Sequence, residues 1–264
     1  RDLAQFFLRR MVPSHFSEER RARYVFVSSR GDLYWIALCG FSPRRSDPVR
    51  IACLWVPDML LAAHLRLEPD LTDVPFALAE GGTSRSRIAA VSTRARLVGV
   101  ELGMDLPLAL ALCASLVVRR VSSEAVTAAR IALLDVARTT GPRVESNEHD
   151  RVFFDCAGTR ILSGSEASLA NVLTSRAQRC GLDVWVGIAD SKLAAYLAAR
   201  ESGGVSIVPP GHAREFLEPR PLSVLEPDAA TASTLASWGI RTIGDLLALP
   251  LGTVAHRLGA NGSK

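Results

Sequence analysis

Lysine is nearly missing from this chain of 264 residues: only Lys192 and Lys264 stand among 31 basic residues, and the others are arginines. Cysteine is sparse as well. The five cysteines form no Cys-x-x-Cys pair, which argues against a structural zinc site and a disulfide framework. The five histidines show no metal-ligand spacing with cysteines or acidic residues. We therefore expect a protein of the reducing cytoplasm without a zinc centre.

Long apolar runs are also lacking. No stretch approaches the roughly 20 residues that a membrane-spanning helix needs. The first residues show neither the charged start nor the apolar segment of a signal peptide. The Gly-x-Ser-x-Gly motif of hydrolases and the phosphate-binding P-loop do not occur. We therefore expect no association with a membrane. The sequence also gives no sign of a Gly-x-Ser-x-Gly hydrolase or of a P-loop nucleotide-binding enzyme.

The chain does have a large apolar fraction and a mild positive charge. Hydrophobic residues make up 48% of the sequence, which is enough for a substantial core in one or two domains. The net charge is +4 and the isoelectric point is about 9.0. This bias is compatible with nucleic-acid binding and does not demonstrate it.

The pattern of apolar residues predicts an α+β protein. Residues 1–50 form an unassigned extension, in which 24–27 and 33–38 are predicted to pair as a hairpin. Residues 51–56 are a predicted strand, and Asp58 is placed to cap a helix that ends near Leu67. Further strands are predicted over 75–80, 88–92, 116–121, 152–156 and 183–188, and helices over 93–98, 107–113, 122–139, 165–180 and 191–200. The order of these elements is typical of a ferredoxin-like sheet with helices.

Lys192 follows a predicted buried strand and stands in the first turn of the next helix. Amide groups at a helix N-terminus attract anions, and a lysine adds a point charge. The position therefore suits contact with a phosphate. From spacing alone, a solvated surface lysine is the simpler interpretation.

Other polar features have simple interpretations too. His64, on the first predicted helix, is expected to be a half-exposed polar residue and not a metal ligand. Cys53 and Cys156 lie in apolar runs and are expected to be buried thiols. The basic, glycine-rich loop over 81–87 is either a contact with a DNA backbone or a solvated loop.

Four segments, taken in order, resemble the Y-family (translesion) DNA polymerases. Residues 51–65 resemble the first palm strand and helix, 91–104 the fingers motif, 186–200 the palm motif with its triphosphate lysine, and 239–246 the thumb. No single segment is specific, but the ordered set is, and it covers roughly residues 50–262. Trp-Val-Pro-Asp at 55–58 and Val-Pro-Pro-Gly at 208–211 are similar to the ImuB-like branch, which occurs in bacterial mutagenesis cassettes.

The resemblance implies a division of the chain into subdomains. The palm would comprise residues 51–66 and 118–219, the fingers 67–117 and the helical thumb 220–264. We expect the little-finger domain of the family to be absent. The expected fold is therefore a Y-family-like palm, fingers and thumb.

The resemblance also implies a two-metal site, and here the sequence departs from the family. The family holds two Mg²⁺ ions with an aspartate on the first palm strand and an adjacent Asp-Glu pair. The matching positions are Val56, Asp150 and Arg151. Asp150 is thus the sole retained acid, and Arg151 places a cation where an anion is needed. Asp58 is an alternative metal ligand, although its role as a helix cap is the simpler interpretation.

The nucleotide-contacting positions are retained in part. Arg96 and Lys192 match the family's triphosphate contacts, whereas Thr93 replaces the fingers tyrosine. Leu61 stands where the family has a sugar-discriminating aromatic residue. We expect the charged groups of Arg96 and Lys192 to converge on one cleft, within about 15 Å of each other.

The implied function is that of a catalytically deficient adaptor in DNA repair and translesion synthesis. Such a protein would need no cofactor and would bind DNA weakly. It would bring an error-prone polymerase and a sliding clamp to a stalled primer. The alternative is an active error-prone polymerase that uses Mg²⁺, Asp150 and an acid recruited from Asp58, Glu145, Glu148 or Asp155. A second alternative is a truncated fragment without function. Restoring both acids, by Val56→Asp with Arg151→Glu, is expected to recover metal binding at most.

Overall fold

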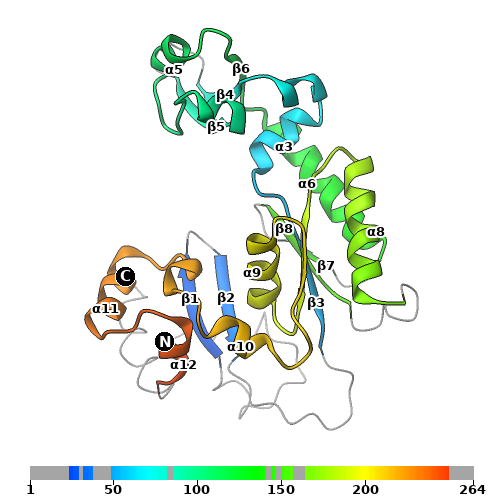
Figure 1. Ribbon diagram of the computed structural model, residues 1–264, viewed down its shortest axis with the longest axis vertical. Helices are drawn as coiled ribbons and strands as arrows, with labels where there is room; N and C mark the ends of the chain where they lie inside the picture. The colour runs from blue at the N-terminus through cyan, green and yellow to red at the C-terminus, as the bar shows by residue number, and fades with distance from the viewer. Residues whose placement is uncertain are drawn as a thin grey trace, which may run out of the picture. The chain divides into compact units, whose positions relative to one another are not determined.

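The computed structural model describes the backbone of residues 24–29 and 32–37, and residues 49–81, 86–140, 144–146, 150–156 and 164–249 with their side chains. The chain divides into two compact units, Asp47–Ala213 and the two chain ends, Arg1–Ser46 with Arg214–Lys264. Within the described parts no helix has both the length and the apolar character to cross a bilayer. The predicted α+β class is confirmed (Figure 1).

A five-stranded sheet is the centre of the larger unit (Figure 1). Its strands, in order across the sheet, are β10 (Val205–Ile207), β9 (Trp185–Ala189), β3 (Ile51–Trp55), β8 (Arg151–Asp155) and β7 (Val144–Ser146). Strand β3 pairs antiparallel with both neighbours, so that Trp55 lies opposite Arg151 on one side and Trp185 on the other. The strands predicted over 51–56 and 152–156 are therefore neighbours in one sheet.

Helices cover both faces of this sheet. On one face, α6 (Ser123–Arg138) and α8 (Glu166–Arg179) form an apolar core with Leu54 and Val56. On the other, α9 (Lys192–Ser202) lies directly on β9 and β3. Gly187 permits this contact, because a Cβ atom there would stand only 1.9 Å from the carbonyl oxygen of Ala195. Cys53 and Cys156 are buried as expected, and burial raises the pKa of both thiols.

Serine caps set the starts of these three helices. The hydroxyl oxygens of Ser122, Ser165 and Ser191 each accept a hydrogen bond from the amide three residues further on. At its other end, α9 stops at Gly203, whose φ of 66° is the left-handed conformation common after a helix. The helix boundaries predicted from the sequence agree with the structure to within about two residues.

A small three-stranded sheet forms the other part of the larger unit. Its strands are β5 (Arg87–Val91), β4 (Phe76–Glu80) and β6 (Val117–Arg120), and nearby lie the 3-10 helix η1 (Pro69–Asp73), α4 (Thr93–Leu97) and α5 (Leu106–Leu112). Strand β6 pairs in parallel with β4. The predicted fingers–palm boundary at 117/118 falls inside β6.

Helix α3 (Met59–Leu65) links the two sheets. Met59 and Ala63 belong to the core of the five-stranded sheet, whereas Leu61 packs against the small sheet. His64 is buried, which corrects the half-exposed position expected from the sequence. Its Nδ1 lies 2.8 Å from the carbonyl oxygen of Leu60 and its Nε2 accepts from the amide of Ser122. The imidazole is a link between α3 and the start of α6, which periodicity along one helix does not reveal.

The second unit contains a hairpin and a helical segment. Strands β1 (Tyr24–Ser29) and β2 (Asp32–Ala37) pair antiparallel, which confirms the predicted hairpin. The helical elements are α10 (Ala213–Leu217), η3 (Leu222–Leu225), α11 (Ala229–Ser237) and α12 (Ile243–Leu247). The C-terminal part of this unit begins at Arg214, six residues before the predicted start of the thumb.

Candidate functional site

Asp150 lies where β3 ends and β8 begins. Its carbonyl oxygen accepts from the amide of Val56 at 3.0 Å and extends the β3–β8 ladder. Its side chain is held by two donors. Oδ2 accepts from the indole Nε1 of Trp55 at 2.7 Å, and Oδ1 accepts from Nε of Arg151 at 2.9 Å. Each carboxylate oxygen therefore already has a protein donor.

The guanidinium of Arg151 is enclosed rather than solvated. Its side chain is 8% exposed, and its Cζ lies 4.0 Å from the centroid of the Tyr196 ring. Trp55 meets Trp185 edge-on at 5.1 Å and Tyr196 at 5.9 Å. Charge pairing with Asp150 and cation–π contact with the ring together offset the cost of burying this cation. The five side chains form one cluster, which we call the Trp55–Arg151 cluster.

The residues present do not fit a pair of Mg²⁺ ions. Magnesium requires oxygen ligands in octahedral geometry, usually with carboxylates that are free to approach it. Val56 is 1% exposed and belongs to the apolar core between the five-stranded sheet and α6. Arg151 contributes a positive charge next to the only retained acid. Across the described residues, no group of three or more histidine, cysteine or acidic side chains is arranged to hold a metal.

Two of the candidate recruited acids have other roles or positions in the structure. Asp58 accepts from the amide of Leu61 at 3.0 Å and caps α3, as expected. Burial raises the pKa of Asp58, although the amide of Leu61 and the charge of Arg96 act in the opposite direction. Asp155 stands at the far end of β8 from Asp150, opposite Ile51. Glu148 lies outside the described residues.

Lys192 and Arg96 each have an acidic neighbour. Nζ of Lys192 pairs with Oε2 of Glu145 at 2.5 Å and lies 6.0 Å from the centre of the Phe153 ring. The ammonium is therefore half-exposed and ion-paired, not fully solvated. Arg96 is exposed on α4, close enough to Asp58 to affect its pKa. Thr93, the first residue of α4, is exposed as well. The convergence of Arg96 and Lys192 on one cleft stays a prediction.

A second buried charge cluster was not predicted from the sequence. Arg50 is 3% exposed and donates to both carboxylate oxygens of Glu166 at 2.7 Å, to Asp190 at 2.6 Å and to the carbonyl oxygen of Val208 at 2.8 Å. The other oxygen of Asp190 accepts from the amide of Gly211. The network fixes the Val-Pro-Pro-Gly segment to the first strand. A lone arginine before an apolar run gave no signal for it.

The predicted thumb motif at 239–246 forms a tight helical turn. Gly239, at a φ of 76°, ends α11, and Thr242 and Asp245 cap α12 reciprocally. The amides of residues 241 and 242 donate to Asp245, and those of 243 and 244 donate to the carbonyl oxygens of 220 and 218. These amides already have acceptors, so the start of α12 offers no unoccupied donor row for a phosphate.

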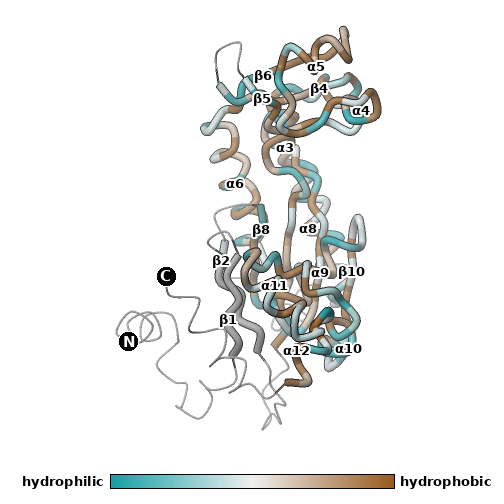
Figure 2. The backbone as a smooth tube through the Cα atoms, turned by 90° about the vertical axis from the view of Figure 1, so that its left-hand side faces the viewer, coloured by the Kyte–Doolittle hydropathy of each residue, from teal (hydrophilic) through white to brown (hydrophobic). Residues whose placement is uncertain are grey.

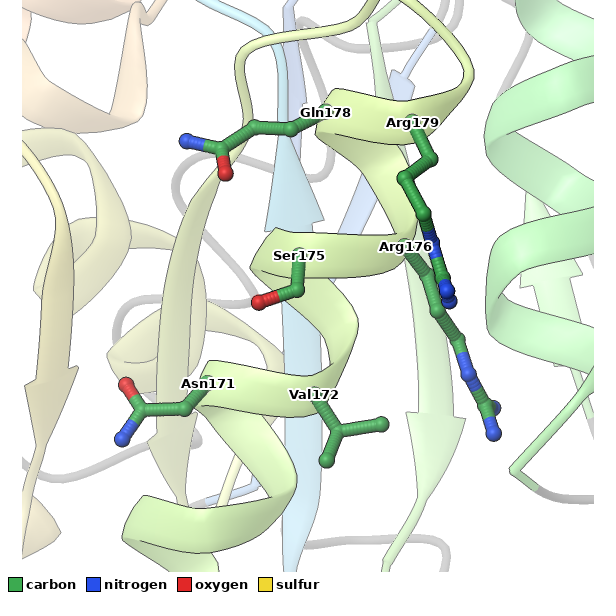
Figure 3. A pocket seen from close by; sticks show the side chains of 6 residues that line it. All are labelled: Asn171, Val172, Ser175, Arg176, Gln178 and Arg179. Atoms are coloured by element: carbon green, nitrogen blue, oxygen red, sulfur yellow. The ribbon is translucent and has the colours of Figure 1, made fainter.

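A shallow hollow lies on the outer face of α8 (Figure 3). Its lining side chains all come from that helix: Asn171, Val172, Ser175, Arg176, Gln178 and Arg179. Figure 3 shows Arg176 and Arg179 extending side by side, and Arg176 donates to Thr139 of α6. None of the predicted site residues lines this hollow.

Comparison with known proteins gives a consistent result. The impB/mucB/samB family matches residues 54–200, more than half of the chain. A DNA polymerase IV of Caulobacter vibrioides is 29% identical over 204 residues, which cover 75% of this chain and 50% of that protein. Protein ImuB of Caulobacter vibrioides is 33% identical over 162 residues, which cover 61% of this chain and 35% of that protein. The chain thus spans about half or less of the length of these relatives.

Solved structures share the fold. DinB from Sulfolobus solfataricus superposes with a TM-score of 0.62 at 18% identity, over 81% of this chain and 64% of that one. The insertion ternary complex of Dbh DNA polymerase gives 0.64 at 17% identity, over 78% and 62%. The larger unit therefore has the palm and fingers architecture of these polymerases.

Proposed function

The chain belongs to the impB/mucB/samB family, and from this premise we propose that it serves DNA-damage tolerance as a polymerase-like adaptor that does not itself join nucleotides. The observation that carries the proposal is the Trp55–Arg151 cluster. Its hydrogen bonds engage both oxygens of Asp150, and Arg151 supplies a fixed positive charge where a family member would need an acid. Two unit charges 4 Å apart interact by about 1 kcal/mol even in water, so a dication is opposed at this position.

The proposed partners are DNA, an error-prone polymerase and a sliding clamp. They follow from the family resemblance, and the adaptor role assigns the nucleotide chemistry to the partner polymerase. Contacts with DNA would run mainly from arginines to phosphates, which makes binding weak, independent of sequence and steeply dependent on salt. Fluorescence anisotropy with a primed duplex at rising salt measures this. Tight, salt-insensitive or sequence-selective binding would contradict it.

The competing function is that of an active translesion polymerase. The similarity to proteins named DNA polymerase IV favours it, whereas Val56 and Arg151 oppose it. Mn²⁺, a paramagnetic substitute for Mg²⁺, separates the two in a direct titration followed by electron paramagnetic resonance. We expect no stoichiometric site near neutral pH. A stoichiometric site that disappears in Asp150→Ala, while Asp155→Ala keeps it, would favour the active polymerase.

A further inference from the structure

The outward face of the fingers helices is apolar and exposed. Among the described residues, twelve large apolar side chains are exposed, and half of them fall within residues 97–112. These six are Leu97, Val98, Leu102, Leu108, Leu110 and Leu112, and Leu97 reaches 83% exposure. Figure 2 shows the strongly hydrophobic colour of α5. We call this surface, from the end of α4 through α5, the α4–α5 patch.

The two helices lie on the same face of the small sheet. Ala95 of α4 and Ala109 of α5 belong to the same core cluster, so both helices pack on one face of the small sheet. Their opposite sides therefore face outward together. From residue 106 to residue 118 the sequence has no charged side chain, although most of α5 is exposed. A contiguous apolar surface of this kind is uncommon on a monomeric protein and marks an interaction site.

Among the described residues, the charged side chains beside the patch are of both signs and partly paired. Arg94 lies 2.9 Å from Asp73 and Arg87 lies 3.5 Å from Asp105, while Arg96 and Glu101 carry opposite charges. A nucleic acid or an anionic membrane would need an excess of cations, which these described residues do not provide. An uncharged centre with a balanced rim can meet an identical copy without net repulsion.

The size of the surface also bears on its occupant. Twelve residues between 97 and 112 are exposed, fewer than the roughly 20–30 residues that each partner contributes to an interface of standard size. A surface of this size suits a small isologous contact, in which the same patch serves on both partners. This interface would be smaller than those of obligate dimers, so the dimer would dissociate on dilution.

We propose that the α4–α5 patch is a self-association surface, through which two copies of this chain pack together about a two-fold axis. The fingers of each copy would cover the exposed leucines of the other. The palm cluster around Asp150 takes no part in the contact. Self-association through the patch therefore does not depend on whether a metal site is present near Asp150, and the two are tested by separate experiments.

Sedimentation velocity over a range of about 1 to about 100 μM, where interfaces of this size dissociate, tests the proposal. We expect the sedimentation coefficient to rise toward that of a dimer, and to stay at the monomer value when Leu97→Glu and Leu108→Glu are combined. Both side chains point to solvent, so the fold should persist. Ile131→Glu, on the exposed side of α6 and outside the patch, is the matched control and should dimerise like the unmodified chain.

Hydrogen exchange on the unmodified chain provides a second measurement without any variant. Exchange over residues 97–112 should slow as the concentration rises, whereas exchange over the exposed side of α6 should not change. A chain that remains monomeric over the whole range would overturn the proposal and leave the patch to a different protein. Dimerisation that survives the double leucine variant, or that is lost equally with Ile131→Glu, would overturn it as well.

Discussion

The indole N–H of Trp55 donates to Oδ2 of Asp150 at 2.7 Å, although the two residues are 95 positions apart in the chain. Arg151 donates to the other oxygen. A hydrogen bond to a charged group contributes about 1.5–3 kcal/mol to stability. The acid that the family would use for metal binding therefore has a structural use here, and its retention does not indicate a working metal site.

Removal of Arg151 should destabilise the larger unit. Arg151→Ala leaves Asp150 without its ion pair and removes the cation from the face of Tyr196. Breaking a fully buried pair costs about 3–5 kcal/mol. Because Asp150 is 24% exposed, we expect about 2–3 kcal/mol, measured by urea denaturation. Arg119→Ala is the control, since its pair with Glu68 is exposed and should matter little. Equal losses from the two variants would argue against the enclosed cluster.

Acidic residues introduced at positions 56 and 151 should destabilise the fold and should not create a metal site. The side chain of Val56 points into the core shared with α6, so Val56→Asp places a carboxylate among apolar groups. We expect a loss of about 3–5 kcal/mol or more, with or without Arg151→Glu. This revises the expectation from the sequence that the double variant recovers metal binding. Val56→Thr, of similar shape, should lose less. A stable double variant that binds Mn²⁺ would contradict the placement of Val56.

The ion pair with Glu145 should reduce the affinity of Lys192 for a nucleoside triphosphate. In Glu145→Gln the ammonium loses its partner, so metal-free affinity for a deoxynucleoside triphosphate should rise. Both side chains are about half-exposed or more, and an exposed pair is worth less than about 1 kcal/mol, or about fivefold in affinity. Fluorescence titration in the presence of a chelator measures the effect. The gain should vanish when Lys192→Ala is added. An unchanged affinity in Glu145→Gln would show that Lys192 does not meet the triphosphate.

Acid should loosen the helical segment of the second unit. The side-chain hydrogen bond from Thr231 is the main cause that lowers the pKa of Asp228, and the backbone amide of Arg241 is the main cause for Asp245. A lowered pKa in the folded state stabilises the fold above the unfolded value of about 3.9, and this stabilisation is lost as the pH falls through the folded value.

Hydrogen exchange of residues 229–237 between neutral pH and about pH 3, corrected for intrinsic rates, tests this effect below the unfolded pKa of about 3.9. Protection of α11 should decrease as Asp228 takes up a proton. Asp228→Asn keeps a good helix cap but does not titrate, so its α11 should depend less on pH. The prediction fails if both proteins lose protection equally.

Local signals in the sequence predicted most of the elements but little of the site. The apolar runs at β3 and β8 and the helices α6, α8 and α9 depend on neighbouring residues, and the predictions of these elements are confirmed. The Trp55–Arg151 cluster joins four separate segments of chain, so no short pattern contains it. The burial of His64 depends on α3 meeting the start of α6. The parallel pairing of β6 with β4 is also non-local, and for this reason the predicted fingers boundary falls inside β6.

Primer extension tests the central claim most directly. The purified chain is incubated with a primed template, all four deoxynucleotides and Mg²⁺, and separately with Mn²⁺. We predict no extended product with either ion, because Val56 and Arg151 replace two of the three expected acids and Asp150 is held by Trp55 and Arg151. Asp150→Ala should give the same blank result. Robust extension by the unmodified chain, abolished by Asp150→Ala and by Asp58→Ala, would contradict the adaptor role and establish an active polymerase.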